Sequence, residues 1–288
     1  MRRRVTFSRN LTLSLSRTCR CYCKYCAFAT HQAHLHEPDE VIATLDGAAK
    51  RHVKELLVLT GERPEVNVEV AQRLREWGHD DFTSYVVWTC ERALERGLLP
   101  HTNLGVLSRE DLLRLREVTA SQGLMLESVN PDLVVHQGSP TKDPVRRLET
   151  IRTAGELRIP FTSGILVGIG ESPEERVAAL EALAEVHAEH GHLQEVILQN
   201  FVPHQSYYGR EPADIADAAA DEFWRTGVGE RPELPLPDWA TSVSIDDMRG
   251  LIGEARRLMP DVGVQVPPNL ADWWPELVAA GATDLGGL

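Results

Sequence analysis

The chain has 288 residues, of which 42% are hydrophobic and 25% charged, a composition typical of a globular protein with a large core. Its formal net charge is −13. This acidic balance argues against nucleic acid or an anionic membrane as a partner, because phosphate groups bind basic surfaces. No apolar run approaches the ~18 residues of a membrane-spanning helix, and the N-terminus lacks the apolar segment of a signal peptide. We therefore expect a cytoplasmic protein.

Strand-like and helix-like segments alternate along the chain. Apolar runs predict strands at residues 11–16, 55–60, 102–106, 123–129, 161–167, 196–201, 262–266 and 283–287. Amphipathic patterns predict helices at residues 38–50, 66–77, 82–96, 109–121, 144–156, 173–190, 245–258 and 270–280. Capping residues mark several helix starts, such as Ser172 followed by Pro173 and an acidic first turn.

Eight strands that alternate with helices predict a parallel α/β sheet closed into a (β/α)8 barrel of the TIM type. An open doubly wound sheet is the alternative. We expect one domain over residues 1–288, with a loop excursion at 203–243 after the sixth strand. In a barrel of this type, that excursion lies among the loops that form active sites. The chain ends just past the eighth strand, so we expect the helix that normally covers this strand to be missing.

Four of the five cysteines lie within eight residues, directly after the first predicted strand. Cys19, Cys23 and Cys26 have the spacing C-x-x-x-C-x-x-C, and Cys21 lies between them without an assigned role. Three thiolates on one short loop can hold three corners of a cubane iron–sulfur cluster. The fourth iron would then be open to a substrate or cosubstrate. So tight a group does not resemble the dispersed cysteines of a disulfide scaffold.

A zinc site is the alternative interpretation of the same run. Structural zinc sites have four ligands, and the imidazoles of His31, His34 and His36 follow closely enough to supply the fourth.

The cysteine spacing, with Tyr25 before the last thiol, resembles the motif of the radical S-adenosylmethionine (radical SAM) superfamily. Thr60–Pro64 resembles the superfamily's GGEP-type motif, although one of its two glycines is absent. Gly164–Glu171 resembles the G-x-I-x-G-x-x-E motif beside adenine, with leucine in place of isoleucine. The resemblance implies a [4Fe-4S] cluster held by three cysteines, whose open iron binds S-adenosylmethionine (SAM). One-electron reduction then yields a 5′-deoxyadenosyl radical.

The same resemblance implies which residues bind SAM. Gly61 and Glu62 are expected at its amino group, Glu127 and Ser128 at its ribose. Arg147 is expected at its carboxylate, which a guanidinium can bind in a bidentate manner. The residues expected near the adenine are Tyr25, Leu166 and Gly168.

Beyond these motifs, nearly the whole chain is similar to the small radical SAM subunits of the synthases that make 7,8-didemethyl-8-hydroxy-5-deazariboflavin, the chromophore of a deazaflavin coenzyme. The segments that carry this resemblance are 18–28, 54–64, 78–85, 101–105, 125–128, 155–171, 199–204 and 264–270. The resemblance implies a carbon–nitrogen lyase that cyclises 5-amino-5-(4-hydroxybenzyl)-6-(D-ribitylimino)-5,6-dihydrouracil with loss of ammonia. It also implies two functional partners, a second radical SAM enzyme that makes this adduct and a one-electron reductant.

A site for so polar and polyhydroxylated an aromatic substrate requires aromatic faces and neutral hydrogen-bonding groups. The residues expected to bind the substrate are Asn200, His204, Tyr207, Gln265 and Asn269. His34 and His36 are candidates for proton transfer, because imidazole titrates near neutral pH. No catalytic acid or base is otherwise indicated.

Two alternative functions are open at this point. Another radical SAM enzyme, of the menaquinone-pathway or biotin-synthase-like group, would share the cluster motif. The biotin-synthase-like group needs ligands for a second cluster, whereas Cys90 is the only cysteine outside residues 19–26. A zinc-stabilised binding module without catalysis is the other alternative.

Overall fold

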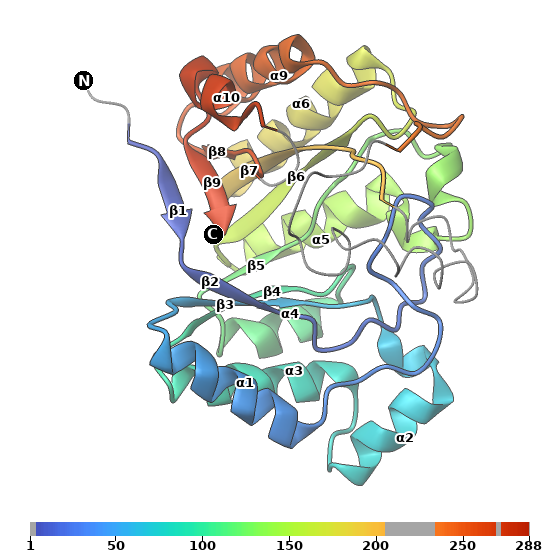
Figure 1. The fold of residues 1–288 in the computed structure, drawn as a ribbon, viewed down its shortest axis with the longest axis vertical. Coiled ribbons are helices and arrows are strands. Elements are labelled where there is room, and N and C mark those ends of the chain that lie inside the picture. The colour runs from blue at the N-terminus through green and yellow to red at the C-terminus, as the bar shows by residue number, and fades with distance from the viewer. Residues whose placement is uncertain (1–3, 205–233, 269–271, 288) are drawn as a thin grey trace.

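Nine parallel strands form the centre of the computed structural model, which describes residues 4–204, 234–268 and 272–287. The strands are β1 (Thr6–Ser8), β2 (Asn10–Leu13), β3 (Glu55–Leu59), β4 (Leu99–Asn103), β5 (Ser121–Gly123), β6 (Phe161–Val167), β7 (Leu193–Asn200), β8 (Gly263–Gln265) and β9 (Asp284–Gly287). They are hydrogen-bonded in the order β1-β9-β8-β7-β6-β5-β4-β3-β2. Figure 1 shows the two ends of this sheet brought together.

The ring closes through a divided first strand. β1 and β2 are consecutive segments on either side of Arg9. β1 pairs with β9, the last strand, and β2 pairs with β3. The predicted (β/α)8 barrel is confirmed, and the ninth strand is the first half of its divided first strand. β1 is absent from the predicted strands because its three residues are too few to show the two-residue alternation of apolar and polar side chains.

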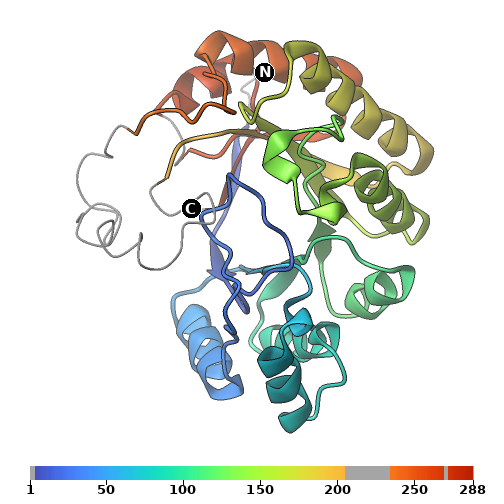
Figure 2. The same ribbon diagram turned by 90° about the vertical axis from the view of Figure 1, so that its right-hand side faces the viewer.

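Helices surround the strands on the outside (Figure 2). They are α1 (Pro38–Lys50), α2 (Val68–Glu76), α3 (Phe82–Leu94), α4 (Arg109–Arg116), α5 (Pro144–Glu156), α6 (Pro173–His190), α9 (Ile245–Leu258) and α10 (Trp274–Ala280). Short 3-10 turns are η1 (Pro64–Val66), η2 (Val134–His136) and η3 (Pro140–Lys142). The bounds of α1, α5, α6 and α9 match the prediction at both ends.

Capping explains why these helix starts are so well defined. Ser172 accepts a hydrogen bond from the Glu175 backbone N–H, and the Glu175 side chain accepts one from the Ser172 N–H. This reciprocal pair satisfies two of the donors that a helix start leaves free. Pro173 supplies the first helical residue without losing a needed N–H.

The fourth predicted strand, 123–129, was wrong in position. β5 ends at Gly123, and the chain leaves the extended conformation at Glu127, whose φ is +69°. Only one isolated bridge, between Glu127 and Ile165, continues the pairing. Leu124 and Leu126 are buried without being part of a strand, and Met125 between them lines the barrel cavity.

The main core lies between the sheet and its helices. One cluster joins β6 and β7 to α5, α6 and α9, and a second joins β2 and β3 to α1 and α3. Residues 205–233, most of the predicted excursion at 203–243, lie outside the described residues. None of the helices in the described ranges has the length and hydropathy needed to cross a membrane.

Gly164 allows β6 and β7 to pair closely. A Cβ added there would lie 2.2 Å from the carbonyl oxygen of Ile197, which is part of the sheet backbone. We expect Gly164→Ala to destabilise the protein by about 1–3 kcal/mol, because the neighbouring strand cannot move without breaking pairs. Urea denaturation followed by circular dichroism measures this.

Gly250 provides the matched control, because it lies in α9 with no atom within 4 Å of an added Cβ. Gly250→Ala is expected to stabilise the helix by ~0.5–1 kcal/mol. Equal effects of the two substitutions would contradict the close approach at Gly164.

Candidate active site

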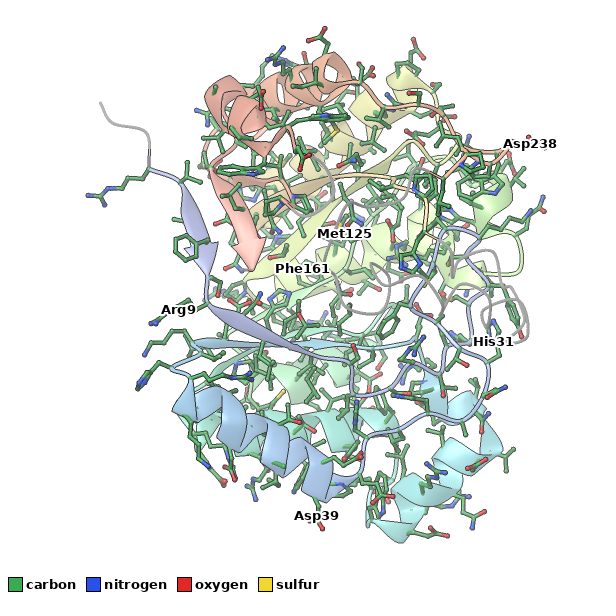
Figure 3. The ribbon with its side chains drawn as sticks, in the orientation of Figure 1. Arg9, His31, Asp39, Met125, Phe161 and Asp238 are labelled. Carbon is green, nitrogen blue, oxygen red and sulfur yellow. The ribbon has the colours of Figure 1, made fainter. Side chains whose placement is uncertain are left out.

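A long loop, residues 14–37 between β2 and α1, crosses the C-terminal mouth of the barrel and carries four cysteines; we call it the cluster loop. Figure 2 shows this blue segment over the centre of the ring. In Figure 3, His31 marks the loop at the opposite side of the barrel from Arg9, which lies between the two halves of the first strand. The loop is held to itself by a hydrogen bond from the Cys19 N–H to Thr30, 3.0 Å. A second hydrogen bond, from the Lys24 N–H to the Val135 carbonyl at 3.0 Å, holds the loop to η2.

The turn after β3 holds the other side of the loop. The Gly61 N–H donates to the Ser16 carbonyl at 2.7 Å, and the Arg20 N–H donates to the Glu62 carbonyl at 3.0 Å. A Cβ on Gly61 would lie 2.0 Å from the Thr18 carbonyl oxygen. Only glycine allows so close an approach of two backbones.

Backbone donors are directed at the first thiol. The Glu62 N–H donates to Cys19 Sγ at 3.2 Å, and the Cys21 N–H donates to the same sulfur at 3.4 Å. The hydrogen bond with the Cys21 side chain lowers the pKa of Cys19, although burial opposes the effect. The thiolate is the form that binds metal.

The other two thiols of the motif also have hydrogen-bonding neighbours, but their pKa values are raised. The hydrogen bond with the Cys21 side chain and burial raise the pKa of Cys23, and burial raises that of Cys26. The Ala29 N–H donates to Cys26 Sγ at 3.4 Å, and Cys23 Sγ lies 3.5 Å from Ser139 Oγ. Hydrogen bonds to cysteine sulfur are one of the ways a protein tunes an iron–sulfur cluster. The donor set of Cys19, Cys23 and Cys26 therefore fits such a cluster. Cys21 lies buried between them: its side chain hydrogen-bonds with those of Cys19 and Cys23, and its sulfur is 3.1 Å from Thr141 Oγ1.

The three histidines of the zinc interpretation are bound elsewhere. His31 Nδ1 lies 3.1 Å from the Cys19 carbonyl, His34 Nδ1 accepts from the Arg17 N–H at 3.1 Å, and His36 Nδ1 lies 3.3 Å from the Glu40 carboxylate. Within the described residues, no three His, Cys, Asp or Glu side chains are grouped to hold a single metal ion, and this includes the three thiols of the motif. The fit of those thiols to a cluster therefore rests on their chemistry and their hydrogen bonds. His34 and His36 lie 5.3 Å apart where the loop returns to α1, and the barrel cavity described below is lined by other residues.

A buried carboxylate with two cations lies under the cluster loop. Glu127 Oε1 is 2.6 Å from Lys142 Nζ and 3.8 Å from an Arg147 nitrogen. Burial raises the pKa of Glu127, but the two positive charges outweigh it and the pKa is lowered. Ser128, beside it, is buried and accepts a hydrogen bond from the Asn130 N–H.

Arg147 is itself anchored to the barrel wall. Its Nε donates to the Met125 carbonyl at 2.6 Å and its Nη1 to the Thr141 carbonyl at 3.1 Å. Met125 lies near the middle of the molecule in Figure 3. The guanidinium thus joins the barrel wall to the segment that binds the cluster loop.

Unpaired polar atoms are buried in the same place. Tyr25 Oη and both ring nitrogens of His136 have no hydrogen-bond partner in the described structure. The two rings meet edge to face, with centroids 5.7 Å apart, and Lys142 Nζ lies 5.4 Å from the centre of the Tyr25 ring. Burial lowers the pKa of His136 to about 4. Buried polar atoms without partners are costly, so this arrangement fits a ligand that supplies them. Tyr25 also packs against the small core cluster that contains Leu166.

Glu62 is held firmly. Its Oε1 accepts from Arg20 Nε at 2.8 Å, and its Oε2 accepts from the Val106 N–H at 3.3 Å. This carboxylate therefore fastens the cluster loop to two strand ends.

The glycines of the Gly164–Glu171 motif lie close to atoms of neighbouring protein segments, whereas the sequence resemblance predicts that the motif lies beside adenine. Gly168 has a φ of +98°, and a Cβ there would lie 2.6 Å from Val243 and 2.9 Å from the Thr241 carbonyl. Glu171 accepts hydrogen bonds from the Gly168 and Ile169 N–H groups at 2.7 and 2.8 Å and pairs with Arg176. The Glu171 carboxylate thus holds the turn of the motif in place through the Gly168 and Ile169 N–H groups and Arg176.

The barrel interior is a cavity of about 450 Å³, unlike the packed interior usual for this fold. Its lining residues are Thr6, Phe7, Ser8, Asn10, Glu55, Leu57, Leu59, His101, Asn103, Ser121, Met125, Thr162, Gln194, Glu195, Ile197, Gly263, Gln265, Asp284 and Gly286. Of the expected substrate residues, Gln265 lies in this lining and Asn200 is buried at the end of β7. His204 follows four residues later, and Tyr207 and Asn269 lie outside the described residues.

Sequence reasoning missed Lys142, His136 and the polar lining of the barrel. Charged residues at the first position of buried strands, such as Glu55 and Asp284, were an available signal. Lys142 and His136 end three-residue 3-10 turns, which are too short to show a period that would place a side chain.

The model of the Radical SAM superfamily matches residues 13–183. The chain is 40% identical to the 7,8-didemethyl-8-hydroxy-5-deazariboflavin synthase of Methanosarcina mazei, covering 99% of this chain and 77% of that protein. It is 39% identical to the synthase of the same name from Archaeoglobus fulgidus, covering 99% and 79%.

Solved structures share the fold. The hydrogenase maturase HydG from Carboxydothermus hydrogenoformans has a TM-score of 0.72 at 18% identity, covering 98% of this chain and 58% of that one. Methylornithine synthase (PylB) has a TM-score of 0.66 at 18% identity, covering 98% and 72%. The near full-length similarity favours the deazariboflavin synthases over the menaquinone-pathway, biotin-synthase-like and zinc-module alternatives. The chain therefore belongs to the radical SAM superfamily and, within it, to the 7,8-didemethyl-8-hydroxy-5-deazariboflavin synthase family.

Proposed function

We propose that this protein cyclises 5-amino-5-(4-hydroxybenzyl)-6-(D-ribitylimino)-5,6-dihydrouracil to 7,8-didemethyl-8-hydroxy-5-deazariboflavin, as an ammonia-releasing carbon–nitrogen lyase. The ring closes through a new carbon–nitrogen bond, the bond to the amino group breaks, and two electrons leave the substrate. When bound, the [4Fe-4S] cluster and SAM supply a 5′-deoxyadenosyl radical, and SAM takes up those electrons as it becomes methionine and 5′-deoxyadenosine. The observation that carries the proposal is a loop of three hydrogen-bonded thiols over a polar barrel cavity, in a chain of this family.

In this proposal Cys19, Cys23 and Cys26 hold the cluster. SAM contacts the mouth of the barrel around the unpaired Tyr25 hydroxyl and the Glu127 carboxylate. The remaining proposed SAM contacts are Gly61, Glu62, Ser128, Arg147, Leu166 and Gly168. Because Glu62 and Arg147 already bind protein groups, their main effect is to fix the loop and the wall on which SAM lies.

The proposed partners follow from the substrate. A second radical SAM enzyme supplies the adduct, and a one-electron reductant supplies the electron that reduces the cluster.

An anaerobic assay tests the proposal directly. The protein is reconstituted with iron and sulfide, reduced with dithionite, and given SAM and the adduct; 5′-deoxyadenosine, deazaflavin and ammonia are then quantified. We expect all three. Formation of 5′-deoxyadenosine without deazaflavin would refute the substrate assignment, and absence of both from a cluster-loaded preparation would refute the radical chemistry.

The cysteine assignment makes a separate prediction. Cys19→Ser, Cys23→Ser and Cys26→Ser are each expected to lose most of the bound iron and sulfide, because each removes one of three thiolate ligands. Iron and sulfide analysis with visible absorption measures this without requiring turnover.

Cys90→Ser is the control, because Cys90 is buried in the outer core, and Cys21→Ser tests the fourth thiol of the loop, which bonds Cys19, Cys23 and Thr141. Both are expected to load a full cluster. A cluster lost from Cys21→Ser and kept in Cys23→Ser would contradict the assigned triple.

A further inference from the structure

The cavity inside the barrel has a polar floor and an upper wall of mixed polarity. At the strand starts, its floor is formed by the side chains of Thr6, Ser8, Glu55, Ser121, Thr162, Glu195 and Asp284. Toward the mouth, Leu57, Leu59, Ile197 and Met125 form an apolar band. The polar lining residues His101, Asn103 and Gln265 lie beside it on the paired strands. From Glu55 to Leu59 the wall is about 13 Å tall, at ~3.3 Å per residue.

The floor groups are already organised by hydrogen bonds. Ser8 Oγ donates to Glu55 Oε2 at 3.0 Å, and Thr6 Oγ1 donates to the Asp284 carboxylate. Burial, followed by the charge of the neighbouring Asp284, raises the pKa of Glu195 to about 9. Glu195 therefore carries a proton near neutral pH, so the floor offers both donors and acceptors.

The charge of the lining selects among ligands. The described lining includes three carboxyl groups and neither lysine nor arginine. A phosphate or carboxylate on a ligand would find neither lysine nor arginine in this lining and would meet the half-buried Asp284 and Glu55 carboxyl groups, which is unfavourable. A metal ion does not fit either, because no three ligating side chains in the described ranges are grouped to hold one. Neutral hydroxyl groups match this lining.

We infer that the floor of the barrel binds the free polyol chain of the substrate, with Glu55, Glu195 and Asp284 as its hydroxyl partners, and excludes a phosphorylated chain. The inference rests on the proposed function, which supplies a substrate with a ribityl chain at one end and a hydroxybenzyl ring at the other. The ring then meets the apolar band near the mouth, where Met125 is joined through its carbonyl to Arg147. The substrate is thereby oriented with its reacting end toward the cluster loop.

Binding measurements test this without turnover. Equilibrium dialysis on the reconstituted protein would give the Kd of three ligands: the ribityl adduct, the same adduct with a terminal phosphate, and an adduct with ethyl in place of ribityl. We expect the last two to bind at least about tenfold more weakly, the loss of roughly one charge-assisted hydrogen bond. Equal Kd values for the three ligands would overturn the inference.

Asp284→Asn and Glu55→Gln keep the size of the side chain and remove the charge. Each is expected to raise the Kd of the ribityl adduct about tenfold and to reduce the discrimination against phosphate. Asp261→Asn is the control, because this exposed carboxylate bonds His187 on the outer surface. The melting temperature identifies any variant that fails to fold, and the two floor variants are independent of one another. Folded floor variants with the Kd values of the control would overturn the assignment.

The deazaflavin assay separates this inference from the function on which it rests. Selective binding of the ribityl adduct without turnover would leave the floor site standing and refute the proposed reaction. Turnover of all three adducts with equal KM would support the proposed reaction and refute the floor site.

Discussion

The close approach of two backbones at Gly61 and Thr18 is the constraint on which the mouth of the barrel depends. It lets the turn after β3 donate from Gly61 to Ser16 and from the Glu62 N–H to the Cys19 sulfur. The same turn places the Glu62 carboxylate where Arg20 and the Val106 N–H hold it. One glycine therefore fixes both the path of the cluster loop and the direction of its first thiol.

The second anchor is electrostatic. Glu127, Lys142 and Arg147 form a buried group whose charges are nearly all shielded from water. Such a group stabilises a structure only when each charge has its partners, and here the Met125 and Thr141 carbonyls supply the remaining ones for Arg147. The result is a rigid wall between the loop of thiols above and the barrel cavity below. The unpaired Tyr25 hydroxyl and His136 nitrogens face this junction, which is where the proposal places SAM.

Local signals carried much of the fold prediction. The helices that begin with Pro38, Pro144 and Pro173 matched at both ends, because capping and proline define a helix start from its own neighbours. Strand bounds were less accurate, because a strand is defined by the neighbour with which it pairs. β5 is the short polar run Ser121–Gly123, and the apolar residues after it were taken for the strand. The cysteine motif was visible because its spacing lies within one loop. The polar barrel floor was not, because ring closure alone brings β1, β3, β7 and β9 to one cavity.

The most direct test of the account is the electron paramagnetic resonance spectrum of the reconstituted, dithionite-reduced protein, recorded with and without SAM. The account predicts the signal of one reduced [4Fe-4S] cluster that changes when SAM binds, because three thiolates leave one iron open. A cluster signal that SAM does not alter, or a protein that binds no cluster, would contradict it.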